Sequence, residues 1–262
     1  MSGTARFTLE ESGALARIVV DGGKGNVFDR PLIAALSQSL REAAATPTAR
    51  AVVIEGAGDH WSFGASVEDH RPAKMRPFLA EFHALIRQLM TLDLPRIAVV
   101  RGQCLGGGLE IALACQRIVA SPSARLGQPE IKLAVFAPVA SLLLPSRVGQ
   151  PVADDLLLTG RSIAADEALR LRLVDEVAAD PLEAARAWVR TSLAPLSASS
   201  LRFAARAAAT LTRHDFLARL DEIERLYVDE LMATPDAVEG IAAFLERRPA
   251  RWAAATLSGA TS

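Results

Sequence analysis

The sequence predicts an α/β fold in which strands and helices form layers around one core. Residues 50–55 (RAVVIE) and 97–100 (IAVV) are short apolar runs rich in β-branched residues, which indicates buried strands. Glycine-containing turns and helical patterns of apolar residues follow these runs. Half of the 262 residues are hydrophobic, enough for a substantial core. Repeated strand–turn–helix units of this kind are typical of a layered α/β protein.

The N-terminal segment begins with a predicted β-hairpin over residues 5–20, turning at Ser12-Gly13. A glycine-rich loop follows at residues 21–26. The next apolar residues have helical spacing and predict a helix that starts near Pro31: Leu32, Ile33, Leu36 and Leu40. The strand at residues 50–55 and a turn at residues 56–60 complete this segment.

The middle of the chain carries the clearest strand–turn–helix unit. A long amphipathic helix over Phe78–Leu92 ends before Pro95 and leads into the strand at 97–100. Three glycines at 106–108 then precede a helical pattern from Leu109 to Cys115. Residues 117–120 (RIVA) predict a further short strand.

The last third of the chain is mostly helical and rich in alanine. We expect two short helices at 153–159 and 164–171 and a final strand at 173–177. Four helices are then predicted, over residues 182–193, 198–211, 216–232 and 235–247. Helices gathered at one end indicate a covering or oligomerisation layer rather than the chemical centre.

Composition excludes several classes of protein. The net charge is −1 with acidic and basic residues interspersed, which argues against nucleic acid as the main partner. The longest apolar run, near residues 133–145, is interrupted by Pro138 and Ser141 and is too short to cross a bilayer. No secretory signal region is visible in the first residues. We therefore expect a cytoplasmic protein with no membrane partner.

Cysteine and histidine usage gives no sign of a disulfide or metal centre. Cys104 and Cys115 are expected to be buried, reduced thiols. His60 and His70 flank the segment 61–67 and are interpreted as loop residues. Because no group of His, Cys and carboxylate residues has metal-ligand spacing, we predict no metal.

Two glycine-containing turns can present backbone N–H groups. The three glycines at 106–108 lie between a strand and a helix start, where free N–H groups bind a phosphate or a developing oxyanion. Alternatively, they only permit close strand–helix packing, with Glu110 as a favourable charge at the helix N-terminus. Gly64-Ala65 offers a similar turn or an ordinary one. Lys24 can meet a phosphate or remain a solvated loop lysine.

These turns combine with two carboxylates into a plausible reaction centre. Donors from two separate turns would form an oxyanion hole for a thioester or a similar carbonyl group. Glu130 follows Glu110 by twenty positions, after Gly127-Gln-Pro129. Two carboxylates beside one carbonyl can serve as acid and base on a reacting carbon.

Taken together, these motifs resemble the crotonase (enoyl-CoA hydratase/isomerase) superfamily over nearly the whole chain. Its segments are matched by FGAS at 63–66, CLGGGLE at 104–110 and LGQPE at 126–130. LTGR at 158–161 and AAFLERR at 242–248 also look like late family segments. The resemblance implies an oxyanion hole made by the backbone N–H groups of Ala65 and Gly107, with Glu110 and Glu130 as catalytic residues.

The resemblance also implies the architecture, the substrate class and the assembly. Residues 1–195 would form a spiral of ββα units that binds the thioester. Residues 196–262 would form a C-terminal helical region for oligomerisation and pocket cover. The substrate would be an acyl-CoA thioester, with no separate cofactor, and the assembly a homotrimer or a dimer of trimers. Coenzyme A would lie along these residues: Lys24, Ser62, Phe63, Ala65, Ser66 and Val67.

Retention of both glutamates favours a hydratase within the superfamily. Two departures narrow this further: Ser66 stands where hydratases usually have an acid, and residues 133–141 (LAVFAPVAS) replace a glycine-rich stretch. We expect four residues of this stretch to shape the acyl pocket, although they can also be plain core packing: Phe136, Ala137, Pro138 and Val139.

This combination resembles the hydratases of cyclohexa-1,5-diene-1-carbonyl-CoA, which act in anaerobic aromatic-acid degradation through benzoyl-CoA. The implied product is 6-hydroxycyclohex-1-ene-1-carbonyl-CoA. One alternative is a general acyclic 2-enoyl-CoA hydratase with the same catalytic residues. The other is a non-catalytic crotonase-fold protein that binds RNA, against which the near-neutral charge and the retained glutamates speak.

Overall fold

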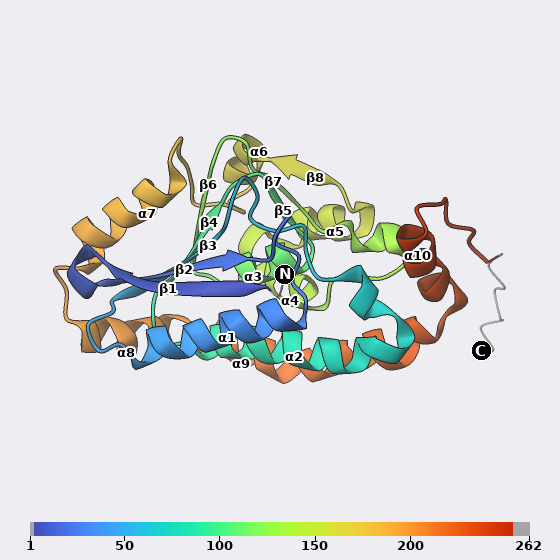
Figure 1. Ribbon diagram of the computed structural model, residues 1–262, viewed down its shortest axis with the longest axis horizontal. Helices are drawn as coiled ribbons and strands as arrows, with labels where there is room; N and C mark the ends of the chain where they lie inside the picture. Colours follow the sequence, from blue (N-terminus) through green and yellow to red (C-terminus); the bar gives the residue numbers. More distant parts are fainter. Residues whose placement is uncertain (1–2, 254–262) are drawn as a thin grey trace.

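Two β-sheets surrounded by helices make up the fold (Figure 1). The computed structural model describes residues 3–253. The first sheet has six strands in the order β1-β2-β3-β4-β6-β9; only the β1–β2 pair is antiparallel. Its strands are β1 (Thr4–Glu10), β2 (Leu15–Asp21), β3 (Ala51–Gly56), β4 (Arg96–Val100), β6 (Arg117–Ala120) and β9 (Glu176–Val177).

Both faces of the first sheet are buried, because successive side chains along a strand point to opposite faces. In β4, Ile97 and Val99 join a cluster with Leu182 and Val189, on and just after helix α7 (Pro181–Trp188). Ala98 and Val100 face the larger core on the other side of the sheet. This burial on both faces explains why the central strands are continuous apolar runs.

A second, smaller sheet carries the chain toward the site. It has the order β5-β7-β8, with β5 (Gln103–Leu105) parallel to β7 (Arg125–Gly127) and β8 (Ser162–Ala164) antiparallel to β7. β4 and β5 lie in different sheets and are followed by α3 (Gly107–Leu113), which completes one ββα unit. The predicted α/β fold of ββα units is confirmed.

Long helices cover the larger core face of the first sheet. α1 and α2 run side by side beneath it in Figure 1, and α9 lies along the same side, while α7 covers the opposite face. The remaining bounds are α1 (Arg30–Ala45), α2 (Pro72–Thr91), α4 (Pro138–Val148), α5 (Gln150–Thr159), α6 (Ala165–Arg170), α8 (Ala198–Ala208), α9 (Thr210–Arg225) and α10 (Pro235–Leu245). π-helical turns cover Val189–Leu193 and Leu226–Glu230, and Pro129–Leu133 is a short 3₁₀ helix.

Several bounds differ from the sequence prediction. α2 begins at Pro72 rather than Phe78, although Pro77 lies inside it. Pro77 lacks an N–H and leaves the carbonyl of Ala73 without its helical partner, but Ala73 is exposed and water can satisfy it. The predicted strand at 173–177 pairs only at Glu176–Val177, and the three short strands of the second sheet were not predicted.

The C-terminal helices share the main core. Phe216 and Leu220 of α9 and Tyr227 of the following π turn belong to the same buried cluster as strands β2 and β4. The predicted helix at 198–211 ends at Ala208, and the predicted helix at 216–232 changes to a π turn at Leu226. Residues 1–2 of the predicted core region (1–195) and residues 254–262 of the predicted C-terminal region (196–262) lie outside the described residues.

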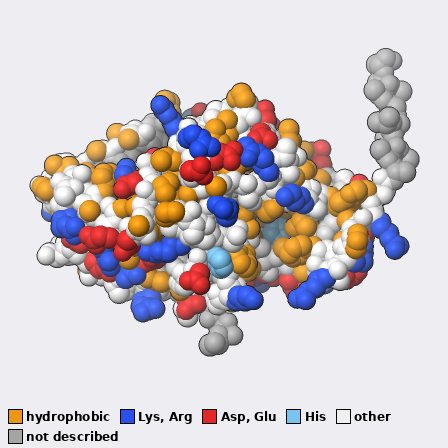
Figure 2. Space-filling view, turned by 90° about the horizontal axis from the view of Figure 1, so that it is seen from above, with side chains coloured by type: hydrophobic (Ala, Val, Ile, Leu, Met, Phe, Trp, Pro, Cys, Tyr) orange, Lys and Arg blue, Asp and Glu red, His pale blue; other side chains and the backbone are white. Residues whose placement is uncertain are grey.

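The surface carries mixed charge. Figure 2 shows Lys and Arg side chains alternating with Asp and Glu over the face seen from above. Both cysteines are buried and free, as predicted. Among residues 3–253, no helix is long and apolar enough to span a membrane, and no group of three or more His, Cys, Asp or Glu is arranged to hold a metal ion.

Candidate active site

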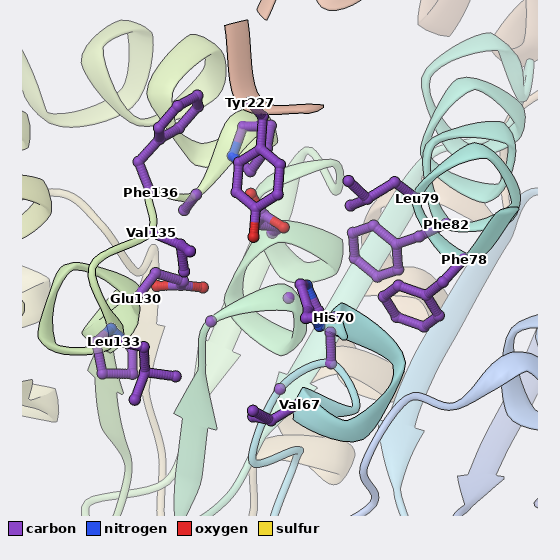
Figure 3. Close-up of a pocket in the computed structure, with 18 of the residues that line it drawn as sticks. Val67, His70, Phe78, Leu79, Phe82, Glu130, Leu133, Val135, Phe136 and Tyr227 are labelled. Atoms are coloured by element: carbon purple, nitrogen blue, oxygen red, sulfur yellow. The ribbon is translucent and has the colours of Figure 1, made fainter. Parts of the chain in front are cut away.

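A partly enclosed cavity of about 90 Å³ lies where the two sheets, α2, α3 and the C-terminal helices meet. Its floor is made by the two predicted turns, at Gly64-Ala65 and Gly106-Gly107. Figure 3 shows Glu130 and Val135 on one side of the cavity and Phe82 on the opposite side. The side chain of Tyr227 points between these two sides. Most of the remaining lining is apolar or aromatic, so a polar group in this cavity is poorly shielded by water.

The backbone N–H groups of Ala65 and Gly107 lie next to each other. Ser62 pairs with β5: its N–H donates to the Gln103 carbonyl (2.9 Å), and its carbonyl accepts from the Leu105 N–H (3.0 Å). A β-carbon built on Gly107 would stand 3.2 Å from the Ala65 nitrogen. Neither N–H donates to another group in the described part of the chain. Two converging, unused donors of this kind suit an oxyanion.

Buried polar contacts fix the first of these turns. The Ser62 hydroxyl donates to the Asn26 carbonyl (2.8 Å) and accepts from the Gly64 N–H (2.9 Å). The Asn26 amide in turn donates to the carbonyls of Ala57 and His60. Ser62 is fully buried and lies behind the cavity wall. Its hydroxyl group therefore shapes the turn, and the contact with coenzyme A that the resemblance implies stays a prediction.

Glu110 projects into the cavity from the first turn of α3. One carboxylate oxygen, Oε1, accepts hydrogen bonds from the N–H groups of Val139 (2.8 Å) and Ala140 (2.9 Å) at the start of α4. Burial raises the pKa of Glu110, while those N–H groups and the nearby His83 oppose the rise. The helix start thus favours the ionised form of this carboxylate.

Glu130 lies in the 3₁₀ helix Pro129–Leu133 and faces the same cavity. In the amide orientation that satisfies its neighbours, the Gln128 nitrogen donates to both carboxylate oxygens of Glu130 (3.1 Å each). Burial, followed by the charge of Glu110, raises the pKa of Glu130 to about 8. The two carboxylates therefore resist carrying two negative charges at once.

This asymmetry separates the chemical roles open to the two glutamates. Glu110 has two backbone donors that stabilise its carboxylate, so it is the better base. Glu130 keeps its proton near neutral pH and is the better acid. One acid, one base and two converging N–H groups can add water across, or remove it from, a bond next to a carbonyl group.

Three of the four residues predicted for the acyl pocket line the cavity: Phe136, Ala137 and Pro138. Val139 does not. Its side chain is fully buried in the core, and its contribution to the site is the backbone N–H that holds Glu110. Val139 points into the core because α4 starts at Pro138, and the helix turns the side chain after Pro138 away from the cavity.

The other residues predicted to bind coenzyme A lie at the mouth of the cavity or beside it. Phe63 is 40 % exposed, lines the cavity and packs over Gly25, next to the exposed Lys24. Val67 lines the cavity. Ser66 is half-buried, and its hydroxyl accepts from the Asp69 N–H to cap a short helical turn.

Several cavity residues were missed by the sequence analysis. Tyr227 and Ile241 come from the C-terminal region, which the resemblance predicted to cover the pocket but for which no single lining residue was named. His70, interpreted as a loop residue, lines the cavity, and so does the fully buried His83 of α2. Burial lowers the pKa of His70. One signal for these residues was present in the sequence: His83 is a polar residue within the apolar face of a predicted helix.

The fold and the site together suit a protein that stabilises an oxyanion and moves protons beside it. The model of the enoyl-CoA hydratase/isomerase family matches residues 10–255, and the chain belongs to this family. The chain is 48 % identical over 251 residues to cyclohexa-1,5-dienecarbonyl-CoA hydratase of Thauera aromatica, covering 96 % of this chain and 97 % of the relative.

Solved structures agree with this assignment. An enoyl-CoA hydratase/isomerase of Pseudoalteromonas atlantica T6c has a TM-score of 0.83 at 27 % identity, covering 95 % of this chain and all of the other. An enoyl-CoA hydratase of Mycobacterium avium subsp. paratuberculosis K-10 has a TM-score of 0.80 at 28 % identity, covering 95 % of this chain and 98 % of the other.

Proposed function

We propose that the protein is a hydro-lyase that adds water to a conjugated acyl-CoA thioester. The observation that carries this proposal is the placing of Glu110 and Glu130 beside the converging N–H groups of Ala65 and Gly107. The thioester oxygen would accept from the two N–H groups, which stabilise the enolate that forms during addition. Glu110 would take a proton from water, and Glu130 would act as the acid.

We further propose cyclohexa-1,5-diene-1-carbonyl as the acyl group. The likeness to the Thauera aromatica hydratase supports this choice, because it extends over nearly the whole of both chains. The cavity supports it too: it is compact, and Phe136 and Tyr227 close it with an edge-to-face ring contact at 5.2 Å between centroids. Flat rings pack well against such aromatic walls, whereas a long acyl chain would meet Tyr227.

The proposed reaction is a 1,4-addition. Hydroxide bonds to the β carbon of one double bond while Glu110 takes the remaining proton of water. The electron pair of that double bond moves toward the thioester oxygen and spreads over the second double bond as a dienolate. A proton then bonds to the γ carbon at the far end, which gives 6-hydroxycyclohex-1-ene-1-carbonyl-CoA. Atoms balance as substrate plus one water.

The binding of coenzyme A and the assembly are also proposals. Phe63 and Lys24 beside the mouth of the cavity suit the adenine ring and a phosphate of coenzyme A. A homotrimer or a dimer of trimers is supported by large apolar side chains exposed on the C-terminal helices, such as Phe203, Leu211 and Phe244. Light scattering of the purified protein tests the assembly, and cell fractionation tests the cytoplasmic location.

The substrate is tested by an absorbance assay with two thioesters side by side. We expect cyclohexa-1,5-diene-1-carbonyl-CoA to be hydrated at least about tenfold more efficiently than crotonyl-CoA, a preference of ~1.4 kcal/mol. Equal or better use of crotonyl-CoA would make the protein a general acyclic 2-enoyl-CoA hydratase. If the protein hydrated neither of the two thioesters, the hydro-lyase assignment would be wrong.

A further inference from the structure

A second acid–base pair lies in the wall of the cavity, apart from the two glutamates. His83 is fully buried on α2 and lines the cavity directly after Phe82. Its Nδ1 lies 2.7 Å from the Oε2 oxygen of Glu224 on α9. Within the described residues its Nε2 is buried and has no hydrogen-bond partner. A buried polar atom without a partner in a cavity wall calls for a ligand.

Glu224 fixes the orientation of this imidazole. The carboxylate is one-quarter exposed, and its pKa is lowered by the hydrogen bond from His83, so it is ionised at neutral pH. A carboxylate bound to Nδ1 keeps a proton on that nitrogen. Nε2 is thereby left as the ring nitrogen that can give or accept a proton, and His83 lines the cavity.

His83 and Glu130 come from different walls of the cavity. Figure 3 shows Glu130 with Leu133, Val135 and Phe136 on one side and the α2 residues Phe78, Leu79 and Phe82 on the other. His83 follows Phe82 on α2. His83 and Glu110 line the same cavity. A ring held between these walls would have Glu130 on one side and the α2 wall on the other.

The proposed 1,4-addition needs a proton where an ordinary hydration does not. In an acyclic enoyl thioester the proton returns to the α carbon, next to the thioester. In the cyclic diene it returns to the γ carbon, which lies across the ring from the carbon that receives the hydroxyl group. We propose that His83, held by Glu224, delivers this proton from Nε2 to the γ carbon.

The step balances without any further reagent. The N–H bond at Nε2 breaks as the C–H bond forms, and the electron pair of the dienolate becomes that C–H bond. The second double bond moves next to the thioester carbonyl, and His83 is left neutral. The proton that Glu110 took from water equals the one that His83 gave, so exchange with solvent restores both groups. This inference rests on the proposed function and deepens it.

The test is a comparison of two substrates in a single variant. His83→Gln is expected to lower kcat for cyclohexa-1,5-diene-1-carbonyl-CoA by about 100-fold, the usual size of an acid–base contribution. Hydration of crotonyl-CoA is expected to stay within about threefold, because α protonation stays with the glutamates. A structural role alone would lower both rates together, and that outcome would overturn the proposal, as would equal retention of both rates.

A second variant and a control guard against misfolding. Glu224→Gln keeps the shape of the partly exposed partner and is expected to lower only the cyclic rate, by about tenfold. Glu222→Gln, exposed on the same helix, should leave both rates unchanged. In D₂O, proton NMR of the wild-type product should show deuterium at the γ carbon. Failure of the wild-type enzyme with the cyclic diene would refute the proposed substrate, whereas unchanged selectivity in both variants would refute only the role of His83.

Discussion

The carboxylate of Glu130 lies directly against the backbone of Gly106. A β-carbon built on Gly106 would stand 2.6 Å from Oε1 of Glu130, closer than any real contact of that kind. Gly106 also has a φ of +51°, in the left-handed region, and its N–H donates to the carbonyl of Gly127 (3.0 Å). The glycine turn thus makes room for the acid of the site as well as presenting the N–H of Gly107.

Replacing Gly106 by alanine should therefore displace Glu130. We expect Gly106→Ala to lower kcat by about 100-fold or more, since a misplaced acid loses most of its contribution. Gly58→Ala is the matched control, because Gly58 also has a positive φ (+73°) but nothing within 4 Å of its built β-carbon. Steady-state kinetics and thermal melting of both variants give the comparison. Similar activity losses in the two would assign the effect to backbone strain alone.

Removing either acid–base group should stop turnover with little effect on binding. We expect Glu110→Gln and Glu130→Gln each to lower kcat for crotonyl-CoA, where the proton returns to the α carbon, by about two to four orders of magnitude. Affinity for a CoA thioester should change far less, since backbone and pocket contacts hold the ligand. Isothermal titration with a non-reactive thioester and single-turnover kinetics separate the two quantities. Near-normal turnover in either variant would contradict the two-glutamate mechanism.

The raised pKa of Glu130 makes folding stability depend on pH. The pKa is about 8 in the folded protein against an ordinary value of 4.5, so the folded state holds a proton that the unfolded chain loses. This contribution to stability is fully present below pH 4.5 and is lost as the pH rises toward about 8. Burial raises the pKa of Glu110 as well, with the same sign.

Glu130→Gln should flatten this dependence. Urea unfolding at about pH 5 and about pH 8 is expected to show a larger loss of stability in the wild-type protein than in the variant. Glu222→Gln, whose side chain is exposed on α9, should behave like the wild type. Parallel curves for the wild type and Glu130→Gln would mean that Glu130 is ionised in the folded state.

The parts of the site that are contiguous in the chain could be predicted from the sequence. The turn at 106–108, Glu110 and the strand before them are contiguous, so one backbone path positions them. Glu130 is reached through the short β5–β7 pairing, which places Gly106 beside Gly127. The family resemblance added the roles of oxyanion donors and catalytic glutamates, which stay predictions.

The far wall of the cavity could not be predicted in the same way. Tyr227 lies about a hundred residues from Glu130, and a π turn at Leu226–Glu230, not visible in the apolar pattern, directs its side chain inward. Val139 was predicted to line the pocket, but it contacts the site through its backbone N–H, which donates to Glu110. Sequence patterns do not reveal such a backbone contact. His83 depends on Glu224, more than a hundred positions away.

The proposed oxyanion donor at Ala65 can be tested by a substitution that removes its N–H. Its N–H makes no hydrogen bond among the described residues, because the bridge to Phe28 uses the Gly64 carbonyl and the Ser66 N–H. Ala65→Pro removes the donor and should cost roughly 3 kcal/mol of transition-state stabilisation. Ala65→Ser keeps the N–H and serves as control. An infrared carbonyl stretch of the bound thioester that is unshifted in the wild type would count against polarisation by this donor.

Tyr227 limits the depth of the acyl cavity. Its ring is almost fully buried and meets Phe136 edge-to-face, and Figure 3 shows it directed into the cavity between the two walls. Burial, and then the charges of Glu130 and Glu110, raise the pKa of the Tyr227 hydroxyl, which stays neutral. The residue therefore acts on substrate choice chiefly through the volume of its ring.

Tyr227→Ala should therefore shift the preference toward longer acyl chains. Removing the ring opens the end of the cavity, so kcat/KM for 2-octenoyl-CoA relative to crotonyl-CoA is expected to rise by at least about tenfold, or ~1.4 kcal/mol. Tyr227→Phe keeps the ring and should leave this ratio within about threefold of the wild type. The ratio is measured by initial rates under matched thioester concentrations. If Tyr227→Ala kept the wild-type ratio, another part of the wall would limit acyl length. If the ratio shifted equally in both variants, the effect would belong to the hydroxyl group instead of the ring.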